Sequence, residues 1–234
     1  LGRWPAWVPD GQRLLFVSPR GIEVVSARGG EPRLLLPAPG LERGLAVAPD
    51  GRAFAWVGHD SLQAAPLDGG PARLVTLGHE MHSLAWSPDG HWIAYVTGNI
   101  QYVRLSDIGN IAPSSIWLAP AAGGAPRQVS DSVSMNASPA WASARSLLYV
   151  SNREGGRDVY QLELSGAGDP RGAPHRLTTG LNAHGIHPNW IALNNGTTHG
   201  IEASDAGIQV GLTAEIHKAI EKYQKLVKDY PQAK

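Results

Sequence analysis

One short phrase recurs along this chain at a nearly constant interval. It stands at Trp7–Gly11, Val47–Gly51 and Trp86–Gly90, always ends in Pro-Asp-Gly, and is always followed by an apolar run of strand length. The aspartates of successive phrases are 40 and then 39 residues apart, which matches one four-stranded blade of a repeat protein. The period therefore predicts an all-β fold, a β-propeller built from antiparallel four-stranded blades.

The chemistry of the phrase explains why it marks a hairpin corner. Proline presets φ at the second position of a β-turn, aspartate can accept hydrogen bonds from the nearby backbone, and glycine tolerates the positive φ that reverses the chain. We expect each Pro-Asp-Gly to join the first and second strands of a blade. The glycine pairs Gly29-Gly30, Gly69-Gly70 and Gly123-Gly124 are expected to join the third and fourth strands.

The third repeat is longer than the first two. Its glycine pair begins 34 residues after the preceding aspartate, against 19 in the other two repeats. The extra residues fall between the apolar runs that end at Val96 and begin at Ile116, so an insertion is predicted at about Thr97–Ser115.

Two further units are less regular. In the fourth, Ala142–Arg145 replaces the Pro-Asp-Gly corner, although the strand-like run Leu147–Ser151 follows it. In the fifth, Trp190–Leu193 reads as a strand and Gly200–Ser204 echoes Gly21–Ser26. We therefore expect a propeller of about five blades over residues 1–212, with blades at 3–37, 44–78, 83–130, 138–179 and 184–212. The sequence leaves open whether five units close the ring or a further blade joins them.

The last segment differs in composition from everything before it. Residues 1–212 contain 15 Arg and no Lys, whereas residues 213–234 contain five Lys and no Arg. Apolar residues recur there at intervals of three and four between Thr213 and Pro231, which predicts an amphipathic helix. A single helix cannot bury its apolar stripe alone, so this one is expected to dock on the propeller, on another helix or on another protein.

Composition excludes several classes of function. The formal net charge is zero, so no overall field attracts the chain to nucleic acid or to an anionic membrane. There is no cysteine, which removes disulfides and thiolate metal sites. No apolar run approaches the length of a membrane span, so any membrane association is expected to come through a partner. No cofactor is predicted.

The strand and turn phrases resemble the TolB-like propeller repeat. The resemblance rests on Trp86–Gly90 with the following Ile93–Val96, and on Ser151–Tyr160 ahead of Arg176–Thr178. Similar repeats occur in the propellers of prolyl oligopeptidase relatives and in sensor regions of some bacterial serine/threonine kinases. The resemblance implies a propeller fold and a periplasmic or extracytoplasmic location. The last helix is similar to one helix of a tetratricopeptide unit, a weak match because that repeat needs two.

The topology of a blade predicts a contact surface. The first and third turns of a four-stranded meander lie on one face of the ring, and the second turn and the link to the next blade lie on the other. The insertion therefore projects from the second face, where it contributes Tyr102, Arg104 and Asp107, a mixture of aromatic and charged residues usual at protein interfaces. The other residues expected on that face are His59, His79, Glu80, His82, Asn152, Arg153, Glu154 and His184.

Chemical motifs are few. The histidines of His79-Glu80-Met81-His82 lack the spacing of two metal ligands on one helical face, and the repeated aspartates already have a role in their turns, so no metal site is predicted. There is no Gly-x-Ser-x-Gly nucleophile elbow and no phosphate-binding loop. No catalytic residues are assigned, and the chain is expected not to be an enzyme.

Two functions from different classes follow. The first is a noncatalytic scaffold that binds other protein subunits in a bacterial envelope-associated assembly. The second is a regulatory or substrate-gating propeller of a larger peptidase or kinase whose catalytic part lies outside these residues. A sensor of a small molecule or an ion is a third alternative. Because fold and activity are separable, the repeat alone does not choose among them.

Overall fold

The fold was obtained as a computed structural model, which describes residues 3–37, 44–58, 60–100 and 112–179. Every regular element in these ranges is a β-strand, and the strands form four separate four-stranded sheets. Within each sheet the strands lie in chain order and pair antiparallel with their neighbours. We call the sheets blades 1 to 4.

The strands of each blade follow directly from the repeats. Blade 1 contains β1 (Arg3–Trp7), β2 (Arg13–Ser18), β3 (Gly21–Ser26) and β4 (Arg33–Pro37). Blade 2 contains β5 (Leu45–Val47), β6 (Ala53–Gly58), β7 (Ser61–Pro66) and β8 (Arg73–Leu77). Blade 3 contains β9 (Met81–Trp86), β10 (Trp92–Thr97), β11 (Ser115–Pro120) and β12 (Arg127–Gln128). Blade 4 contains β13 (Asn136–Ser143), β14 (Ser146–Glu154), β15 (Gly156–Glu163) and β16 (His175–Arg176).

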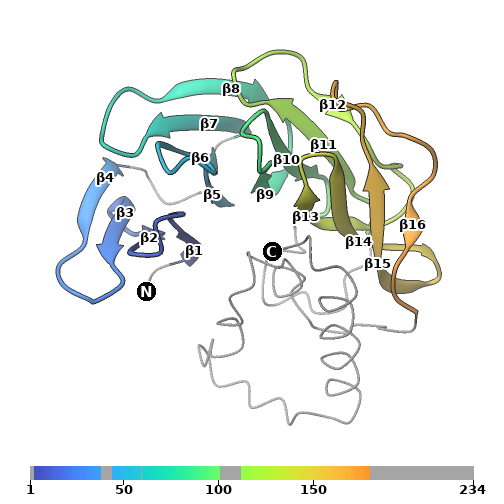
Figure 1. Cartoon of the computed structure of the whole chain (residues 1–234), viewed down its shortest axis with the longest axis horizontal. Coiled ribbons are helices and arrows are strands. Elements are labelled where there is room, and N and C mark those ends of the chain that lie inside the picture. Colours follow the sequence, from blue (N-terminus) through green and yellow to red (C-terminus); the bar gives the residue numbers. More distant parts are fainter. Residues whose placement is uncertain (1–2, 38–43, 59, 101–111, 180–234) are drawn as a thin grey trace, which may run out of the picture.

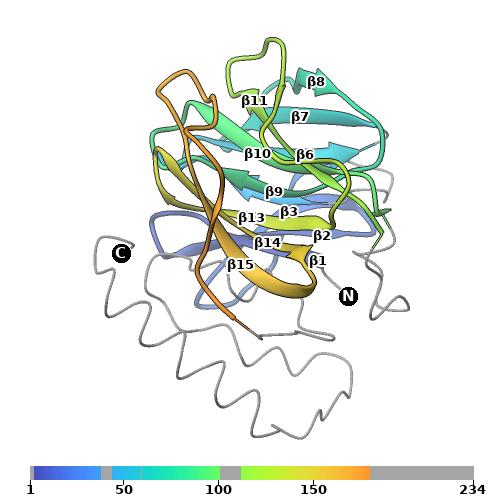
Figure 2. The same ribbon diagram turned by 90° about the vertical axis from the view of Figure 1, so that its right-hand side faces the viewer.

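The blades are arranged around an arc. Their first strands, β1, β5, β9 and β13, lie on the inner side and the fourth strands lie on the outer side (Figure 1). Neighbouring first strands contact one another. In the view turned by 90°, the strands of blade 4 lie in front of the other blades (Figure 2). This radial arrangement of antiparallel sheets confirms the predicted all-β propeller fold.

Each Pro-Asp-Gly phrase forms the corner between the first and second strands. In blade 1 the Gly11 amide donates to the Val8 carbonyl at 2.9 Å, and Gly11 has φ of 67°. The Asp10 carboxylate accepts hydrogen bonds from the amides of Gln12, at 2.8 Å, and Arg13, at 3.2 Å. The local chemistry expected of the phrase is therefore what holds the turn.

The insertion lies where the spacing placed it. Thr97 at the end of β10 pairs with Ser115 at the start of β11, so residues 98–114 leave and re-enter the sheet side by side. In blade 1 the equivalent turn is only Pro19-Arg20, because Ser18 pairs with Gly21.

The two faces of every blade carry different side chains. Pairing places Phe54 with Ala65 and Trp56 with Gln63 on one face of blade 2, and Ala55 with Ala64 and Val57 with Leu62 on the other. We call these the aromatic face and the aliphatic face. Blades 3 and 4 divide in the same way, with Tyr95 and Trp117, or Tyr149 and Tyr160, on the aromatic face.

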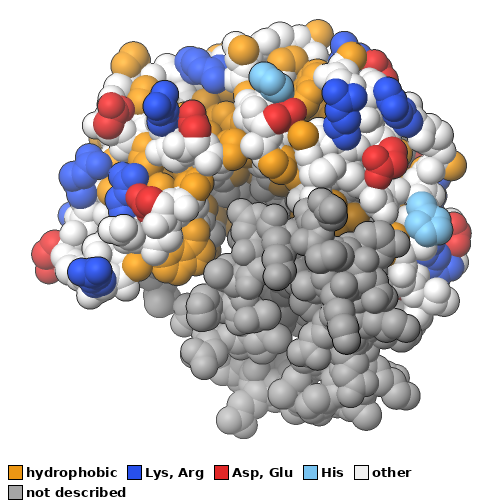
Figure 3. Space-filling model, viewed as in Figure 1, with side chains coloured by type: hydrophobic (Ala, Val, Ile, Leu, Met, Phe, Trp, Pro, Cys, Tyr) orange, Lys and Arg blue, Asp and Glu red, His pale blue; other side chains and the backbone are white. Residues whose placement is uncertain are grey.

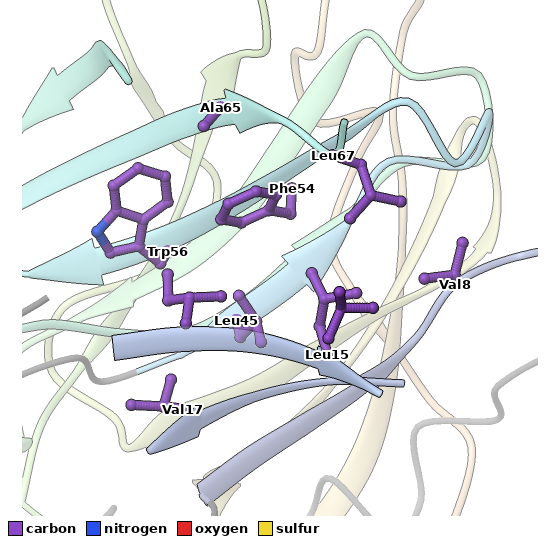
Figure 4. Close-up of a cluster of buried hydrophobic side chains, with 10 residues drawn as sticks. Val8, Leu15, Val17, Leu45, Phe54, Trp56, Ala65 and Leu67 are labelled. Carbon is purple, nitrogen blue, oxygen red and sulfur yellow. The ribbon is translucent and has the colours of Figure 1, made fainter. Parts of the chain in front are cut away.

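The core lies between blades, where an aromatic face meets an aliphatic face. Between blades 1 and 2, the rings of Phe54 and Trp56 pack against Leu15 and Val17 (Figure 4). The next two interfaces repeat this order, with Tyr95 of blade 3 against Val57 of blade 2 and the blade 4 aromatic face against blade 3. Burying this apolar area supplies the main driving force for the fold.

Some expected boundaries differ from the observed strands. β9 begins at Met81 and β13 at Asn136, whereas the sequence placed the starts of these blades at residues 83 and 138. The fifth unit at 184–212 and the helix at 213–234 lie outside the described residues.

Candidate functional site

The candidate site is the face of the arc formed by the turns between second and third strands and by the links between blades. We call it the insertion face, because the described ends of the insertion, residues 98–100 and 112–114, leave and re-enter the sheet there. Of the residues expected there, His59, Tyr102, Arg104, Asp107 and His184 lie outside the described ranges. Glu80, Asn152 and Glu154 lie within the described ranges, as do His79, His82 and Arg153, and the last three lie in different environments.

His82 is completely buried, so its predicted role as a surface contact residue is wrong. It lies on the inner strand β9, and its Nε2 is 3.0 Å from the Gly98 carbonyl oxygen while its Nδ1 is 2.8 Å from the Ser83 hydroxyl. A carbonyl only accepts hydrogen bonds, so Nε2 carries the proton. His82 thus holds the first residue of the insertion.

Other buried bonds close the base of the insertion. The Asn99 side-chain amide donates to the Ala112 carbonyl at 3.0 Å, which joins the two arms of the loop. Gly98 has φ of 83°, and a Cβ there would lie 3.2 Å from the Pro113 carbonyl oxygen, so the close approach of the arms requires glycine.

Blade 4 clamps the second arm of the insertion. The Ser114 hydroxyl donates to the Asn136 carbonyl at 2.8 Å, and the Asn136 side-chain amide donates to the Ser114 carbonyl at 2.9 Å. The same amide donates to the Asp131 carbonyl at 3.0 Å in the link between blades 3 and 4. The base of the loop is therefore fixed to two blades at once.

His79 lies at the surface, in the link between blades 2 and 3. Its side chain is 84% exposed, and its Nδ1 is 3.4 Å from a carboxylate oxygen of Asp60 in the facing turn. The backbone of the two segments also joins, because the Gly78 amide donates to the Asp60 carbonyl at 3.0 Å. His79 thus lies on the insertion face and is open to solvent.

Arg153 is largely held within the protein. One guanidinium nitrogen lies 3.7 Å from the Asp131 carboxylate, another donates to the Tyr149 hydroxyl at 3.4 Å, and the group lies 5.8 Å from the centre of the Tyr160 ring. Its side chain keeps 29% of its exposure. Arg153 therefore joins the β14–β15 hairpin to the blade 3–4 link, and only a minor part of its side chain is exposed.

Asp131, in the link between blades 3 and 4, has a pKa set by its hydrogen bonds. Burial acts to raise its pKa, but hydrogen bonds from Ser134, Val133 and Asn136 outweigh burial and hold the pKa below its usual range. The carboxylate is therefore charged at neutral pH and can pair with Arg153.

Two exposed apolar side chains on this face were missed by the sequence reasoning. Leu77, at the end of β8, is 68% exposed, and Val133, in the link between blades 3 and 4, is 82% exposed. Leu77 borders the link that precedes blade 3, and Val133 lies in the link that follows it. Val133 could have been noticed as an isolated apolar residue within the polar run Ser130–Ser134.

The insertion face presents exposed side chains at the surface of the protein. Within the described residues no group of three or more His, Asp or Glu side chains could hold a metal ion. No helix there is long and apolar enough to cross a membrane.

Comparison with known proteins agrees with the geometry. No protein-family model matches the sequence, and no curated protein matches it. The fold is similar to that of a putative TolB from Agrobacterium tumefaciens, with 22% identity, a TM-score of 0.57, and coverage of 77% of this chain and 63% of that chain. It is also similar to a puromycin-hydrolyzing peptidase from Mycobacterium tuberculosis, with 22% identity, a TM-score of 0.57, and coverage of 77% of this chain and 31% of that chain.

A third similar structure is XC5397 from Xanthomonas campestris, described as a gluconolactonase, with 16% identity, a TM-score of 0.56, and coverage of 76% of this chain and 62% of that chain. This chain spans less than two thirds of each of these structures. At such identities the likeness concerns the fold, and it confirms the resemblance to TolB-like propellers at that level.

Proposed function

We propose that this protein is a noncatalytic propeller scaffold that binds other protein subunits through its insertion face, in a bacterial envelope-associated assembly. The observation that carries the proposal is the anchored base of the insertion. His82 and Asn99 close the loop, and Ser114 and Asn136 clamp it to blade 4. A recognition loop on a fixed base loses less conformational entropy on binding than a free one.

The surface around the loop has the composition of a protein interface. Leu77 and Val133 supply exposed apolar area, and the pairs of His79 with Asp60 and Arg153 with Asp131 supply polar groups on the same face. Interfaces commonly combine an apolar centre with such a polar rim. Tyr102, Arg104 and Asp107 belong to the same insertion and are proposed as the central contacts, with His79, Arg153 and His184 around them. His82 acts beneath them as a positioning residue.

The proposed location is extracytoplasmic, in the periplasm. Two solved structures of similar fold carry the name TolB, the putative protein from Agrobacterium tumefaciens and one from Acinetobacter baumannii. This supports an envelope setting, and any membrane association would come through the bound subunits. Fractionation of the native cells should then recover the protein with periplasmic markers.

A regulatory or substrate-gating role in a larger enzyme is the second candidate. It is favoured by the similar propeller fold of the puromycin-hydrolyzing peptidase, of which this chain covers only 31%. In that case the insertion face would meet a catalytic domain.

A loop replacement tests the scaffold proposal. Residues 100–111 are exchanged for a short Gly-Ser linker, which keeps Asn99 and Ala112 and therefore the base of the loop. The tagged protein is purified from the native envelope fraction, and its bound subunits are identified by mass spectrometry. We expect at least one stoichiometric subunit with the natural sequence and its loss with the linker.

The matched control is Arg52→Glu, an exposed residue beside the Pro-Asp-Gly corner on the opposite face. It should retain the subunit. Recovery of a lone monomer from the native source, or full retention of the subunit by the linker variant, would refute the role of the insertion. A co-purifying polypeptide with a peptidase or kinase domain would favour the second candidate.

A further inference from the structure

One apolar face of blade 1 is not covered by any described blade. Pairing places Trp7, Leu14 and Val25 in one row of this face, and Phe16, Glu23 and Leu34 in the next row. Trp7 is 48% exposed and Leu34 38% exposed, while Leu14, Phe16 and Val25 are half-buried. In Figure 3 hydrophobic side chains gather over β1 at this end of the arc.

This surface is the aromatic face of blade 1. The residues at the position of Phe16 in the other blades are Trp56, Tyr95 and Tyr149, and all three are buried against the preceding blade. Those at the position of Leu14 are equally buried and are Phe54, Ile93 and Leu147. Blade 1 therefore carries the side chains of a blade interface without the blade that would cover them.

The three described blade interfaces indicate which kind of surface can cover the aromatic face of blade 1. In each of the three, an aromatic face packs on an aliphatic face, such as Leu15, Val17 and Ile22 of blade 1 or Val96, Ile116 and Leu118 of blade 3. Two aromatic faces do not meet in any of them. A second copy of the chain offering its own blade 1 would bring like faces together, so the matching occupant is an aliphatic sheet face.

The sequence contains one unit that fits this description. The chain leaves blade 4 after Thr179, and the fifth unit follows at 184–212. Its run Gly200–Ser204 echoes Gly21–Ser26, which places Ile201 and Ala203 where blade 1 has Ile22 and Val24 on its aliphatic face. A ring of five blades lies within the range that propellers adopt.

We propose that residues 184–212 form the blade that packs on the aromatic face of blade 1 and closes the ring. The charge at the centre of that face does not oppose burial, because the Glu23 carboxylate already pairs with the Arg20 guanidinium. A buried carboxylate that keeps its partner costs much less than one left unpaired. This proposal is independent of the function of the insertion face.

The absence of cysteine makes a cross-linking test clean. The full chain carries Val25→Cys together with Ala203→Cys, and a short bis-maleimide is added. The matched control pairs Val25→Cys with Glu202→Cys, because adjacent residues of a strand point to opposite faces. We expect an intramolecular link for the first pair and at least tenfold less for the control.

A second measurement reports on coverage of the face. The thiol of Leu34→Cys should react with a maleimide at least tenfold faster when Ile201→Asp is also present, and at an unchanged rate with Glu202→Gln. Equal linking of both cysteine pairs, links only between separate molecules, or a Leu34→Cys rate that ignores Ile201→Asp would overturn the proposal. None of these results depends on whether the insertion binds a partner.

Discussion

Asn136 is the residue whose loss should most directly loosen the insertion. It is completely buried, and its side-chain amide donates at 2.9 Å to the Ser114 carbonyl and at 3.0 Å to the Asp131 carbonyl. Asn136→Ala would leave the buried Ser114 carbonyl and the part-buried Asp131 carbonyl without these donors. Each such loss costs about 1–3 kcal/mol, so the gross penalty is about 2–6 kcal/mol.

A second effect of Asn136→Ala offsets part of this loss of stability. The Oδ1 atom of Asn136 is buried without a hydrogen-bond partner, and removing it relieves a cost of similar size to one lost bond. The net destabilisation expected for Asn136→Ala is therefore about 2 kcal/mol. This is a large share of the stability of an ordinary domain.

Urea unfolding measures this loss as a fall in the midpoint at constant slope. Hydrogen exchange should locate it, with faster exchange at Ser114 to Ile116 and little change in blades 1 and 2. Gln128→Ala is the control, because that exposed side chain makes one bond to the Ser130 carbonyl and its loss should cost less than about 1 kcal/mol. An Asn136→Ala cost below that of the control would refute the view that this residue clamps the insertion.

Three other outcomes follow from the structure. Phe54→Ala, in the buried interface of blades 1 and 2, should cost about 3–5 kcal/mol, measured by urea unfolding against Leu74→Ala on the exposed rim. The pKa of Asp131 is lower in the folded than in the unfolded chain; its stabilising contribution is complete above its ordinary pKa, and Asp131→Asn should flatten the loss of stability as pH falls below about 4. Burial raises the pKa of Tyr95 and Tyr149 to about 12 and also raises that of Tyr160. Ultraviolet titration should therefore show at least these three tyrosines ionising late, and stability should fall between about pH 10 and 12 as the unfolded chain loses those protons first.

The features predicted well from sequence are those that local chemistry decides. Pro-Asp-Gly forms the corner because its own backbone and side chain make the turn bonds. The insertion was located by counting, since the strands on either side of it kept their apolar pattern and pair as Thr97 with Ser115.

The environments of the site residues are harder to predict from sequence, because they depend on distant parts of the chain. His79 and Glu80, just before His82, favour a surface position, yet His82 lies on β9 at the inner side of the arc (Figure 1). A bulge there leaves Ser83 with φ of 54° and breaks the simple alternation of buried and exposed positions. The clamp between Ser114 and Asn136 joins residues that no local pattern connects.

The unlike faces of each blade give the ring a direction. A duplicated unit would carry an aromatic face that fits the preceding unit and an aliphatic face that fits the following one. Gene duplication can therefore add a unit without any change in the contacting side chains. For the same reason, an array that lacks its last unit leaves the aromatic face of its first unit exposed. Until the unit that covers it has been made, that apolar surface is exposed and can associate with apolar surfaces of other molecules.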